Sequence, residues 1–478
     1  MIGRIVLSTV LIFALSSSSL YATDVSGDVW GEWNATGNPY NVVGDLRVPP
    51  GSTLVIGPGC YIEFQGYYQF LIDTSAVLQV LGTDLDSVYF TAVDTTTGWR
   101  GLFFNSADSS LISYGNFEYV KGNMTVSVIK NEHSHLTITG NSFVYNEVGD
   151  LINCGNDGPA IISDNLFAYN ECETIIFKNF FNSLAIINNI FEYNYGVLIY
   201  TAADTSEIIG NIFRGNYGLV IFGRWADDIK FQRNLVYNNS FYEGPSVFVA
   251  MDAKYTIVHN TICNNISPNH PVGYFEEEHN GQPVLMVNNI FWGNTYGSNS
   301  IFYFDFGFYV NICYCDIQGG WPGYTNMNSD PFFADTSIGD FNLLANSPCI
   351  DAGAPNFPLD PDSTRADMGA FYFDQLTGII QPPMLPQDIT LYQNYPNPFN
   401  ANTIIRFELP GESRVSIDIY DLLGRRVSSI TDAYYRPGMH EILWDGLSQS
   451  GKQLPTGIYL YKLKSDTFEQ TRKMMLLK

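Results

Sequence analysis

A short phrase of polar and apolar residues recurs along the first two thirds of the chain. One copy is Asn189-Ile190-Phe191-Glu192-Tyr193-Asn194, with an apolar residue two positions after the leading asparagine and a second asparagine at the end. From the second copy on, another apolar residue stands three positions before the leading asparagine. The leading asparagines recur at intervals of 22 to 29 residues. A period of this length predicts a solenoid, in which each repeat forms one coil.

The apolar positions of the phrase predict the inside of such a solenoid. The column before the asparagine is Ile138, Ile162, Ile186, Ile208, Phe231, Ile257, Met286 and Phe308. Equivalent residues of neighbouring coils lie one strand spacing apart, about 4.8 Å. The asparagines therefore stack, and each amide donates to the coil on one side and accepts from the other. We expect this ladder to comprise Asn141, Asn165, Asn189, Asn211, Asn234, Asn260, Asn289 and Asn311.

Short β-branched runs separated by proline and glycine precede the repeats. They lie at 48–64, 78–83, 87–92 and 99–104, and a closing run, 346–353, follows the repeats. The early runs resemble the first coils of right-handed parallel β-helix proteins of the pectate-lyase-like superfamily, and the closing run is similar to the terminal coil of secreted bacterial β-helix proteins. The resemblance implies an all-β, right-handed parallel β-helix solenoid over residues 23–373, with capping coils at both ends.

The pattern changes to strict alternation after residue 388. Val415, Ile417 and Ile419 are apolar and the residues between them are polar, which is typical of a half-buried antiparallel strand. Such runs lie at 403–409, 415–420, 440–444, 458–464 and 473–477. Together they predict a small Ig-like antiparallel β-sandwich over residues 389–478.

Four motifs in this part stand in a fixed order. They are Tyr392 to Asn400, Ile419 to Arg425, Trp444-Asp445-Gly446 and Pro455 to Tyr459, followed by a basic tail. They resemble the C-terminal sorting domain of type IX secretion cargo. The resemblance implies that residues 389–478 bind the outer-membrane type IX machinery, and that the protein crosses both membranes and is secreted or held at the cell surface. The alternative is an ordinary appended Ig-like binding module.

The two ends of the solenoid are marked by composition. Arg4, an apolar run at 5–15 and a small-residue exit ending at Ala22 predict a signal peptide over residues 1–22. Residues 374–388 carry a glycine and three prolines and read as a linker. No other apolar run reaches the roughly 18 residues of a membrane span, so we expect no transmembrane segment.

Charge limits the partners. The chain has 23 Lys+Arg and 48 Asp+Glu, a net charge of −25. Residues 389–478 hold 11 Lys+Arg and 9 Asp+Glu, so this part is +2 and the rest is −27. Nucleic acid and polyanionic glycans are therefore disfavoured as direct partners. The seven cysteines are an odd number and read as small buried apolar side chains.

One group of charged residues is the candidate for catalysis. Lyase chemistry on a uronate needs a cation for the carboxylate and a base for the neighbouring proton. The candidates are Arg224, Asp227, Asp228 and Lys230, with Asp252 and Lys254 one coil later. The alternative is a solvated charged edge of the solenoid.

Two further groups are candidates for binding. Tyr145, Tyr169 and Tyr193 are one coil apart, and their stacked rings would form either a sugar platform or a structural corner. Asp360, Asp362 and Asp367 have the oxygen ligands that Ca²⁺ prefers, although the loop lacks the glycine of an EF-hand. Ca²⁺ is the one cofactor that the sequence suggests.

These observations favour a secreted or cell-surface β-helix protein that binds carbohydrate or another surface, exported by its C-terminal domain. The alternative is an enzyme, a polysaccharide lyase or glycoside hydrolase that acts on the face of the β-helix. The repeated phrase specifies the architecture, whereas specificity resides in exposed side chains.

Overall fold

The structure is a computed structural model of the 478-residue chain. It describes residues 22–155, 160–179, 181–276, 283–297, 300–305, 309–323, 325–375, 389–392, 394, 397, 399, 402–410, 413–435, 438–449, 451–465 and 468–476. Most of the predicted signal segment and linker, and Phe308 of the predicted core column, therefore lie outside the described residues. The chain divides into two compact units, Met1–Asn328 and Ser329–Lys478.

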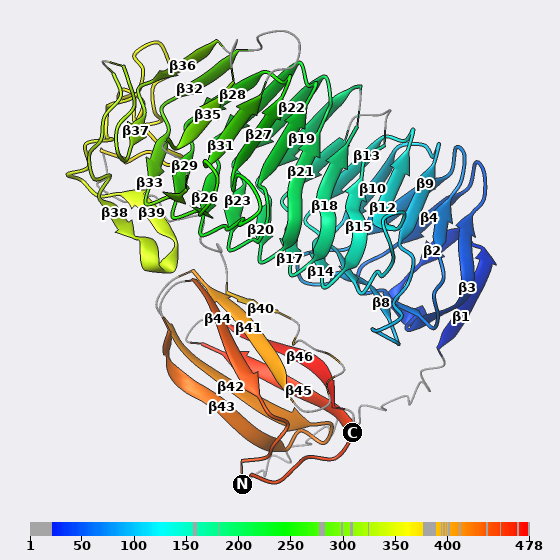
Figure 1. Cartoon of the computed structure of the whole chain (residues 1–478). Coiled ribbons are helices and arrows are strands. Elements are labelled where there is room, and N and C mark those ends of the chain that lie inside the picture. Colours follow the sequence, from blue (N-terminus) through cyan, green and yellow to red (C-terminus); the bar gives the residue numbers. More distant parts are fainter. Residues whose placement is uncertain are drawn as a thin grey trace, which may run out of the picture. The chain divides into compact units, whose positions relative to one another are not determined.

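The first unit is a parallel β-solenoid in which each coil contributes a strand to each of three rows (Figure 1). This confirms the fold class expected from the repeat. The first row is a twelve-stranded sheet within the described chain. Its strands are β2 (Gly31–Trp33), β4 (Thr53–Ile56), β7 (Val77–Leu81), β10 (Ser110–Ser113), β13 (Leu136–Thr139), β16 (Ala160–Ser163), β19 (Ser183–Ile187), β22 (Thr205–Ile209), β25 (Asp228–Gln232), β28 (Tyr255–Val258), β32 (Val284–Val287) and β36 (Val310–Cys313).

The second row carries the residues that follow each leading asparagine. Its strands are β5 (Tyr61–Phe64), β8 (Val88–Ala92), β11 (Gly115–Glu118), β14 (Ser142–Val144), β17 (Leu166–Ala168), β20 (Ile190–Glu192), β23 (Ile212–Arg214), β26 (Leu235–Tyr237), β29 (Thr261–Cys263), β33 (Ile290–Trp292) and β37 (Asp316–Ile317). Strands of this row are short because a corner stands at each end. Each of these strands pairs in parallel with the second-row strand of the neighbouring coil, as β20 does with β17 and β23.

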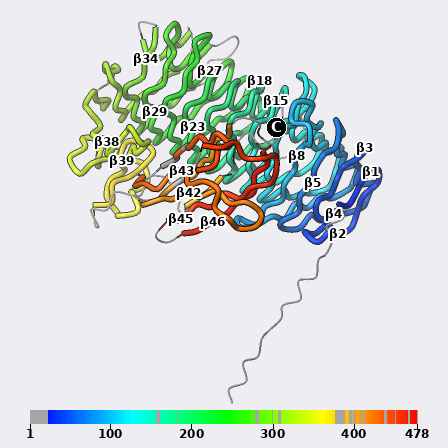
Figure 2. Tube along the Cα trace, turned by 90° about the horizontal axis from the view of Figure 1, so that it is seen from below, coloured from blue at the N-terminus to red at the C-terminus, as the bar shows by residue number. Residues whose placement is uncertain are grey.

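The third row completes each coil. Its strands are β6 (Phe70–Ile72), β9 (Leu102–Asn105), β12 (Ser127–Glu132), β15 (Glu147–Asn153), β18 (Glu171–Lys178), β21 (Tyr195–Thr201), β24 (Ile221–Arg224), β27 (Phe248–Met251), β31 (Gly273–Glu276) and β35 (Phe302–Phe304). Figure 2 follows the same coils as a tube from the blue N-terminal end to the green and yellow ones. The long strand β3 (Tyr40–Val48) pairs with β5 and β6 and joins the second and third rows.

Short elements flank these rows. At the first coil β1 (Thr23–Asp28) pairs with β3, and a 3₁₀ turn, η1 (Ala35–Gly37), is capped by Asn34. Later in the unit β30 (Ile266–Ser267) pairs with β34 (Thr295–Tyr296). In the second unit β38 (Phe333–Asp335), η2 (Thr336–Ile338) and β39 (Asp340–Leu343) form a small antiparallel pair.

Phenylalanines form a column of stacked rings inside the solenoid. Phe167 is fully buried, with its ring centroid 5.2 Å from that of Phe143 and 4.7 Å from that of Phe191. The column extends to Phe117 and Phe213 with similar separations. Stacking at the strand spacing explains why the repeat keeps a phenylalanine two residues after its asparagine.

The leading asparagines form a buried hydrogen-bonded ladder at the first corner. The side-chain amide of Asn189 donates to Oδ1 of Asn211 at 3.0 Å and to the carbonyl of Ile162 at 2.8 Å. The backbone N–H of Asn189 donates to the same Oδ1. This pattern repeats from Asn141 to Asn289. The residue before Asn189, Asn188, has the left-handed backbone conformation that such a corner requires.

The expectation for Asn311 is wrong. Asn311 lies on β36 and is paired with Leu285 in the first row. The ladder position after Asn289 belongs to Cys315, whose Sγ lies 3.7 Å from the Asn289 side-chain nitrogen. Ile312, three residues before Cys315, continues the apolar column of Met286. An apolar residue therefore again stands three positions before the ladder position. The asparagine at position 311 does not mark the ladder, because the chain of this coil has its corner at Cys315.

A second asparagine ladder, which sequence reasoning did not assign, lies at the other corner of the second row. Asn194 donates its side-chain amide to Oδ1 of Asn216 at 3.0 Å and to the carbonyl of Phe167 at 2.8 Å. The members are Asn146, Asn170, Asn194, Asn216, Asn239, Asn265 and Asn294. They are the closing asparagines of the phrase, so the signal was present in the sequence.

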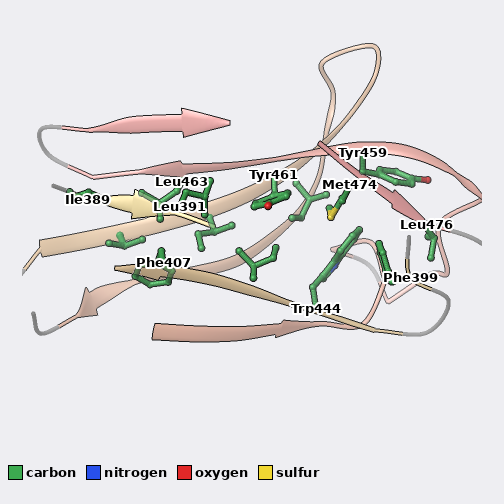
Figure 3. Packing of buried hydrophobic residues seen from close by; sticks show 14 of the residues in the cluster. Ile389, Leu391, Phe399, Phe407, Trp444, Tyr459, Tyr461, Leu463, Met474 and Leu476 are labelled. Carbon is green, nitrogen blue, oxygen red and sulfur yellow. The ribbon is translucent and has the colours of Figure 1, made fainter. Parts of the chain in front are cut away.

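The C-terminal module consists of two antiparallel sheets. One sheet has the order β40 (Thr390–Leu391), β41 (Thr403–Leu409) and β44 (Gly438–Trp444). The other has the order β43 (Arg426–Tyr435), β42 (Ser413–Asp421), β45 (Gly457–Lys464) and β46 (Glu469–Leu476). Phe407 and Trp444 of the first sheet meet Tyr461, Leu463 and Met474 of the second in one buried core (Figure 3). The predicted antiparallel sandwich is thus confirmed.

Candidate functional site

A groove opens where the coils leave the second corner and enter the third row. Its volume is about 460 Å³. Several successive coils contribute to it, so it runs along the solenoid axis. Its lining residues are Gly122, Glu147, Val148, Glu171, Cys172, Glu173, Tyr195, Gly196, Val197, Tyr217, Gly218, Leu219, Phe241 and Glu243. We call this site the axial groove.

Aromatic rings form one wall of the axial groove. The rings of Tyr195 and Tyr217 are stacked, with centroids 5.2 Å apart and planes 8° apart. Tyr242, next to the lining residue Phe241, stacks on Tyr217 at 6.0 Å. Tyr195 is 52% exposed and Tyr242 is 50% exposed. Each ring stacks face to face on its neighbour, so the row presents mainly ring edges to the groove, and Tyr195 and Tyr242 are not part of the core.

Glycines form the floor of the axial groove. A Cβ atom at Gly196 would lie 1.9 Å from the carbonyl oxygen of Cys172, and one at Gly218 would lie 1.9 Å from that of Gly196. Both glycines have positive φ values, 118° and 144°. Their N–H groups donate to carbonyls of the following coil. Only glycine fits this backbone, because a side chain would collide with the backbone of the neighbouring coil.

Carboxylates form the rim. Glu147 makes an ion pair with Lys121 at 2.5 Å. Glu171, Glu173 and Glu243 are exposed, and none of them has an ion-pair partner among the described residues. On the neighbouring strand, burial raises the pKa of Asp150, and the charge of Glu173 adds to this effect. Asn153 opposes it by donating a 2.8 Å hydrogen bond to Asp150. The groove is thus rich in hydrogen-bond acceptors and negative charge.

A stripe of outward-facing aromatic rings lies further along the strands of the third row. The Phe177 and Tyr200 rings are stacked at 5.0 Å, and Phe222 meets Tyr200 edge-on at 5.1 Å. In later coils Tyr274 and Tyr303 stack at 4.8 Å. Strand pairing places these side chains in one column. The third row therefore presents further aromatic side chains beyond the axial groove.

The predicted tyrosine column exists at the second corner. Tyr145 stacks on Tyr169 at 5.5 Å, and Tyr169 stacks on Tyr193 at 5.1 Å. Tyr119 extends the column by one coil at 6.4 Å. All have positive φ values, which cost about 1–2 kcal/mol for a residue with a side chain. The exposed fraction rises from 5% at Tyr119 to 49% at Tyr193. The column is therefore most exposed at the coil that also carries Tyr195.

The predicted catalytic residues lie on two neighbouring coils, and two of them form ion pairs with carboxylates. Lys254 pairs with Asp228 at 3.2 Å, and Lys230 pairs with Glu207 at 2.9 Å, an interaction that raises the Lys230 pKa. The Arg224 guanidinium lies 3.9 Å from the ring centroid of Trp225. Asp227 is exposed and Asp252 lies at a turn with positive φ. Lys230 and Lys254 are thus held in ion pairs, and a catalytic role for this group of residues stays a prediction.

The three predicted calcium ligands bind backbone amides. Asp360 accepts from the N–H of Asp367, and Asp367 accepts from those of Asp351 and Phe373. Asp362 accepts from Thr364 and Gln375. Among the described residues, no group of three or more His, Cys, Asp or Glu side chains is placed to hold a metal. Calcium binding stays a prediction, and an unchanged melting temperature on calcium addition would remove it.

The cysteines are free thiols. Six are buried and Cys313 is partly exposed. Burial raises the pKa of Cys60 to about 11 and those of Cys154 and Cys315 to about 12. Thiolates at these positions would be disfavoured at neutral pH, so the thiols behave as small apolar groups.

The motif residues of the C-terminal module hold its chain ends and turns. The side chain of Asn397 accepts a hydrogen bond from the N–H of Met475 at 2.7 Å, and the N–H of Phe399 donates to the carbonyl of Met475. In the turn between β42 and β43, Asp421 accepts from the backbone of Leu423 and Arg425 and pairs with the Arg425 guanidinium. These contacts lower the Asp421 pKa. The sequence motifs thus correspond to specific stabilising contacts.

Fold and module together define a parallel β-solenoid protein with a C-terminal antiparallel β-sandwich module. Residues 393–477 match the family described as the secretion system C-terminal sorting domain. This confirms the sorting domain and its role in type IX export to the cell surface or the medium. No helix in the described part of the chain is both long and apolar enough to cross a membrane.

Two solved structures show local similarity. Dimeric latent PorU from Porphyromonas gingivalis is 24% identical over 19% of this chain and 9% of its own, with a TM-score of 0.17. PorZ, an essential surface component of the type IX secretion system of the same organism, is 16% identical over 24% of this chain and 14% of its own, with a TM-score of 0.15. The chain thus spans a small part of either protein, and neither likeness carries an argument. Comparison with curated proteins gives no match. Membership in the pectate-lyase-like superfamily stays a prediction.

Proposed function

We propose that the protein is a surface-displayed or secreted carbohydrate-binding protein whose ligand lies in the axial groove. The stacked pair of Tyr195, which is exposed, and Tyr217, which is half-buried, beside a glycine floor carries this proposal. Sugar rings present apolar C–H faces that pack on aromatic rings, and their hydroxyl groups donate to carboxylates. A ligand site typically combines aromatic walls with a few convergent polar groups.

The length of the groove favours a chain-like ligand. Successive coils lie about 4.8 Å apart, so a groove lined by several coils suits an extended oligosaccharide better than a single small molecule. The outward stripe at Phe177, Tyr200 and Phe222 extends the aromatic surface. The corner tyrosines Tyr145, Tyr169 and Tyr193 are proposed as a further platform for sugar rings. Their positive φ values cost free energy, whereas the buried phenylalanines already provide ring stacking without a positive φ.

Single substitutions test this function. Tyr195→Ala and Tyr217→Ala should each weaken binding to a recognised glycan about tenfold or more, since an aromatic contact of this kind is worth about 1–3 kcal/mol. Tyr309→Ala is the matched control, because Tyr309 is 76% exposed and does not line the groove. The purified protein is screened against a glycan panel and affinities are measured by calorimetry. Equal affinities for all variants would overturn the assignment to the groove.

A hydrolytic role of the same face is the second candidate. Glycoside hydrolysis uses two carboxyl groups, one of them kept protonated by a raised pKa. Asp150, with its raised pKa, and the neighbouring Glu173 have these properties. Release of reducing ends from a bound glycan, abolished by Asp150→Asn, would support the enzyme. If the unaltered protein binds the glycan but releases no reducing ends, the hydrolytic role is refuted and only the binding function remains.

A further inference from the structure

The axial groove carries a marked excess of negative charge at its rim. Four glutamates line it, at positions 147, 171, 173 and 243, and Lys121 pairs with the first of them. Asp150 lies on the neighbouring stretch of β15 and is electrostatically coupled to Glu173. No lysine or arginine is among the residues that line the groove. A ligand that enters therefore meets three carboxylates without a protein cation to balance them.

These carboxylates stand next to the aromatic wall. Glu171 is paired in register with Tyr195, and Tyr195 is bridged to Tyr217. A saccharide that lies along the edges of the two rings thus has its substituents close to the rim of the adjoining coil. Glu243 closes the groove at the coil that carries Phe241. The cavity, the edges of the tyrosine rings and the rim carboxylates therefore contact the same ligand.

We propose that the axial groove selects oligosaccharides that carry free amino groups, such as glucosamine units, over their N-acetylated and acidic counterparts. This inference rests on the proposed carbohydrate-binding function and adds the ligand class. A protonated amine placed between Glu171 and Glu173 gains charge-assisted hydrogen bonds that an acetamide cannot make. A uronate carboxylate in the same place meets repulsion. Selectivity arises from the rim, whereas the tyrosines supply affinity to every sugar.

The test compares matched ligands. Chitosan oligomers and fully N-acetylated chitin oligomers of equal length are titrated into the full secreted protein. We expect the free-amine oligomer to bind at least tenfold tighter at low salt, and the difference to shrink as ionic strength rises. Oligogalacturonate should bind more weakly than either. Tighter binding of the acetylated or acidic oligomer would overturn the selectivity.

Charge-removing variants complete the test. Glu171→Gln and Glu173→Gln should abolish most of the preference for the amine and should weaken binding of the acetylated oligomer much less than binding of the free-amine oligomer. Both side chains are exposed, so the variants should unfold at the same temperature as the unaltered protein. Glu32→Gln, at an exposed position outside the groove, is the charge-matched control. Equal binding of all oligomers would refute the selectivity alone, whereas binding of none would refute the carbohydrate function as well.

Discussion

Asn189 donates both its backbone N–H and its side-chain amide to one oxygen, Oδ1 of Asn211, at 2.8 and 3.0 Å. Asn165 makes the same two bonds to Asn189. Each side chain therefore replaces the strand pairing that is interrupted at the corner. The ladder is a continuation of the sheet through its turn, built from side chains.

Replacement of Asn189 by alanine should lower the free energy of unfolding by about 1–3 kcal/mol, because the buried amide groups of Asn165 lose their acceptor. Urea denaturation measures the change. Asn269→Ala, at an exposed turn, should leave the midpoint unchanged. The double variant Asn189→Ala/Asn211→Ala should lose less than the sum of the single variants, since the two side chains share one interaction. An unchanged midpoint for Asn189→Ala would contradict the ladder.

Replacement of Phe167 by alanine should cost about 3–5 kcal/mol, because it empties a fully buried position between two stacked rings. The cost is measured by the shift of the denaturation midpoint. Ile161 lies on the neighbouring first-row strand but is 47% exposed, so Ile161→Ala should cost far less. Equal losses in the two variants would show that the ring column is not the main source of cohesion.

The second unit should lose stability as the pH rises from about 4 to about 7. Burial raises the pKa of Asp367 from 3.8 to about 7, so the folded protein binds this proton more tightly than the unfolded chain. The resulting stabilisation is complete below pH 4 and is lost as the pH passes 7, by about 1–3 kcal/mol. The difference in unfolding free energy between the unaltered protein and Asp367→Asn should follow this curve. A difference that is constant with pH would contradict it.

Removal of residues 389–478 should leave the solenoid folded and prevent its export. The module has a buried core of its own, and the matched sorting family lies within it. Cell fractionation in a host with type IX secretion should find the truncated protein in the periplasm, with the circular dichroism of a folded β protein. Normal surface display of the truncated protein would refute the role of the module.

The architecture was predictable because the solenoid repeats one local solution. Each coil has the same corner, so Asn189 and Phe191 occupy the same structural positions as Asn165 and Phe167 one coil earlier. The alternating strands of the C-terminal module were predictable for a similar reason, since Val415, Ile417 and Ile419 all face its core. The strand β43 was not expected, because register shifts against β42 break its alternation.

The axial groove was not predictable from the repeat. Its wall and rim follow the second corner, where β18 and β21 shift register between Glu171 and Thr174. A fixed offset of six residues from the leading asparagine aligns Glu171 with Tyr195 and Tyr195 with Tyr217, but the offset fails after the shift, where Thr174 pairs with Val197. The glycine floor is equally hidden, since Gly196 and Gly218 matter only through the carbonyl groups of neighbouring coils.

The two asparagine ladders allow coils to be added to or removed from the solenoid without new contacts. All side-chain amides along a ladder donate in one direction, so the interface between any two ladder coils presents the same donors and acceptors. A coil duplicated or deleted beside Asn189 would leave both junctions chemically unchanged. The length of the solenoid can thus evolve in steps of about 4.8 Å, without redesign of its terminal coils.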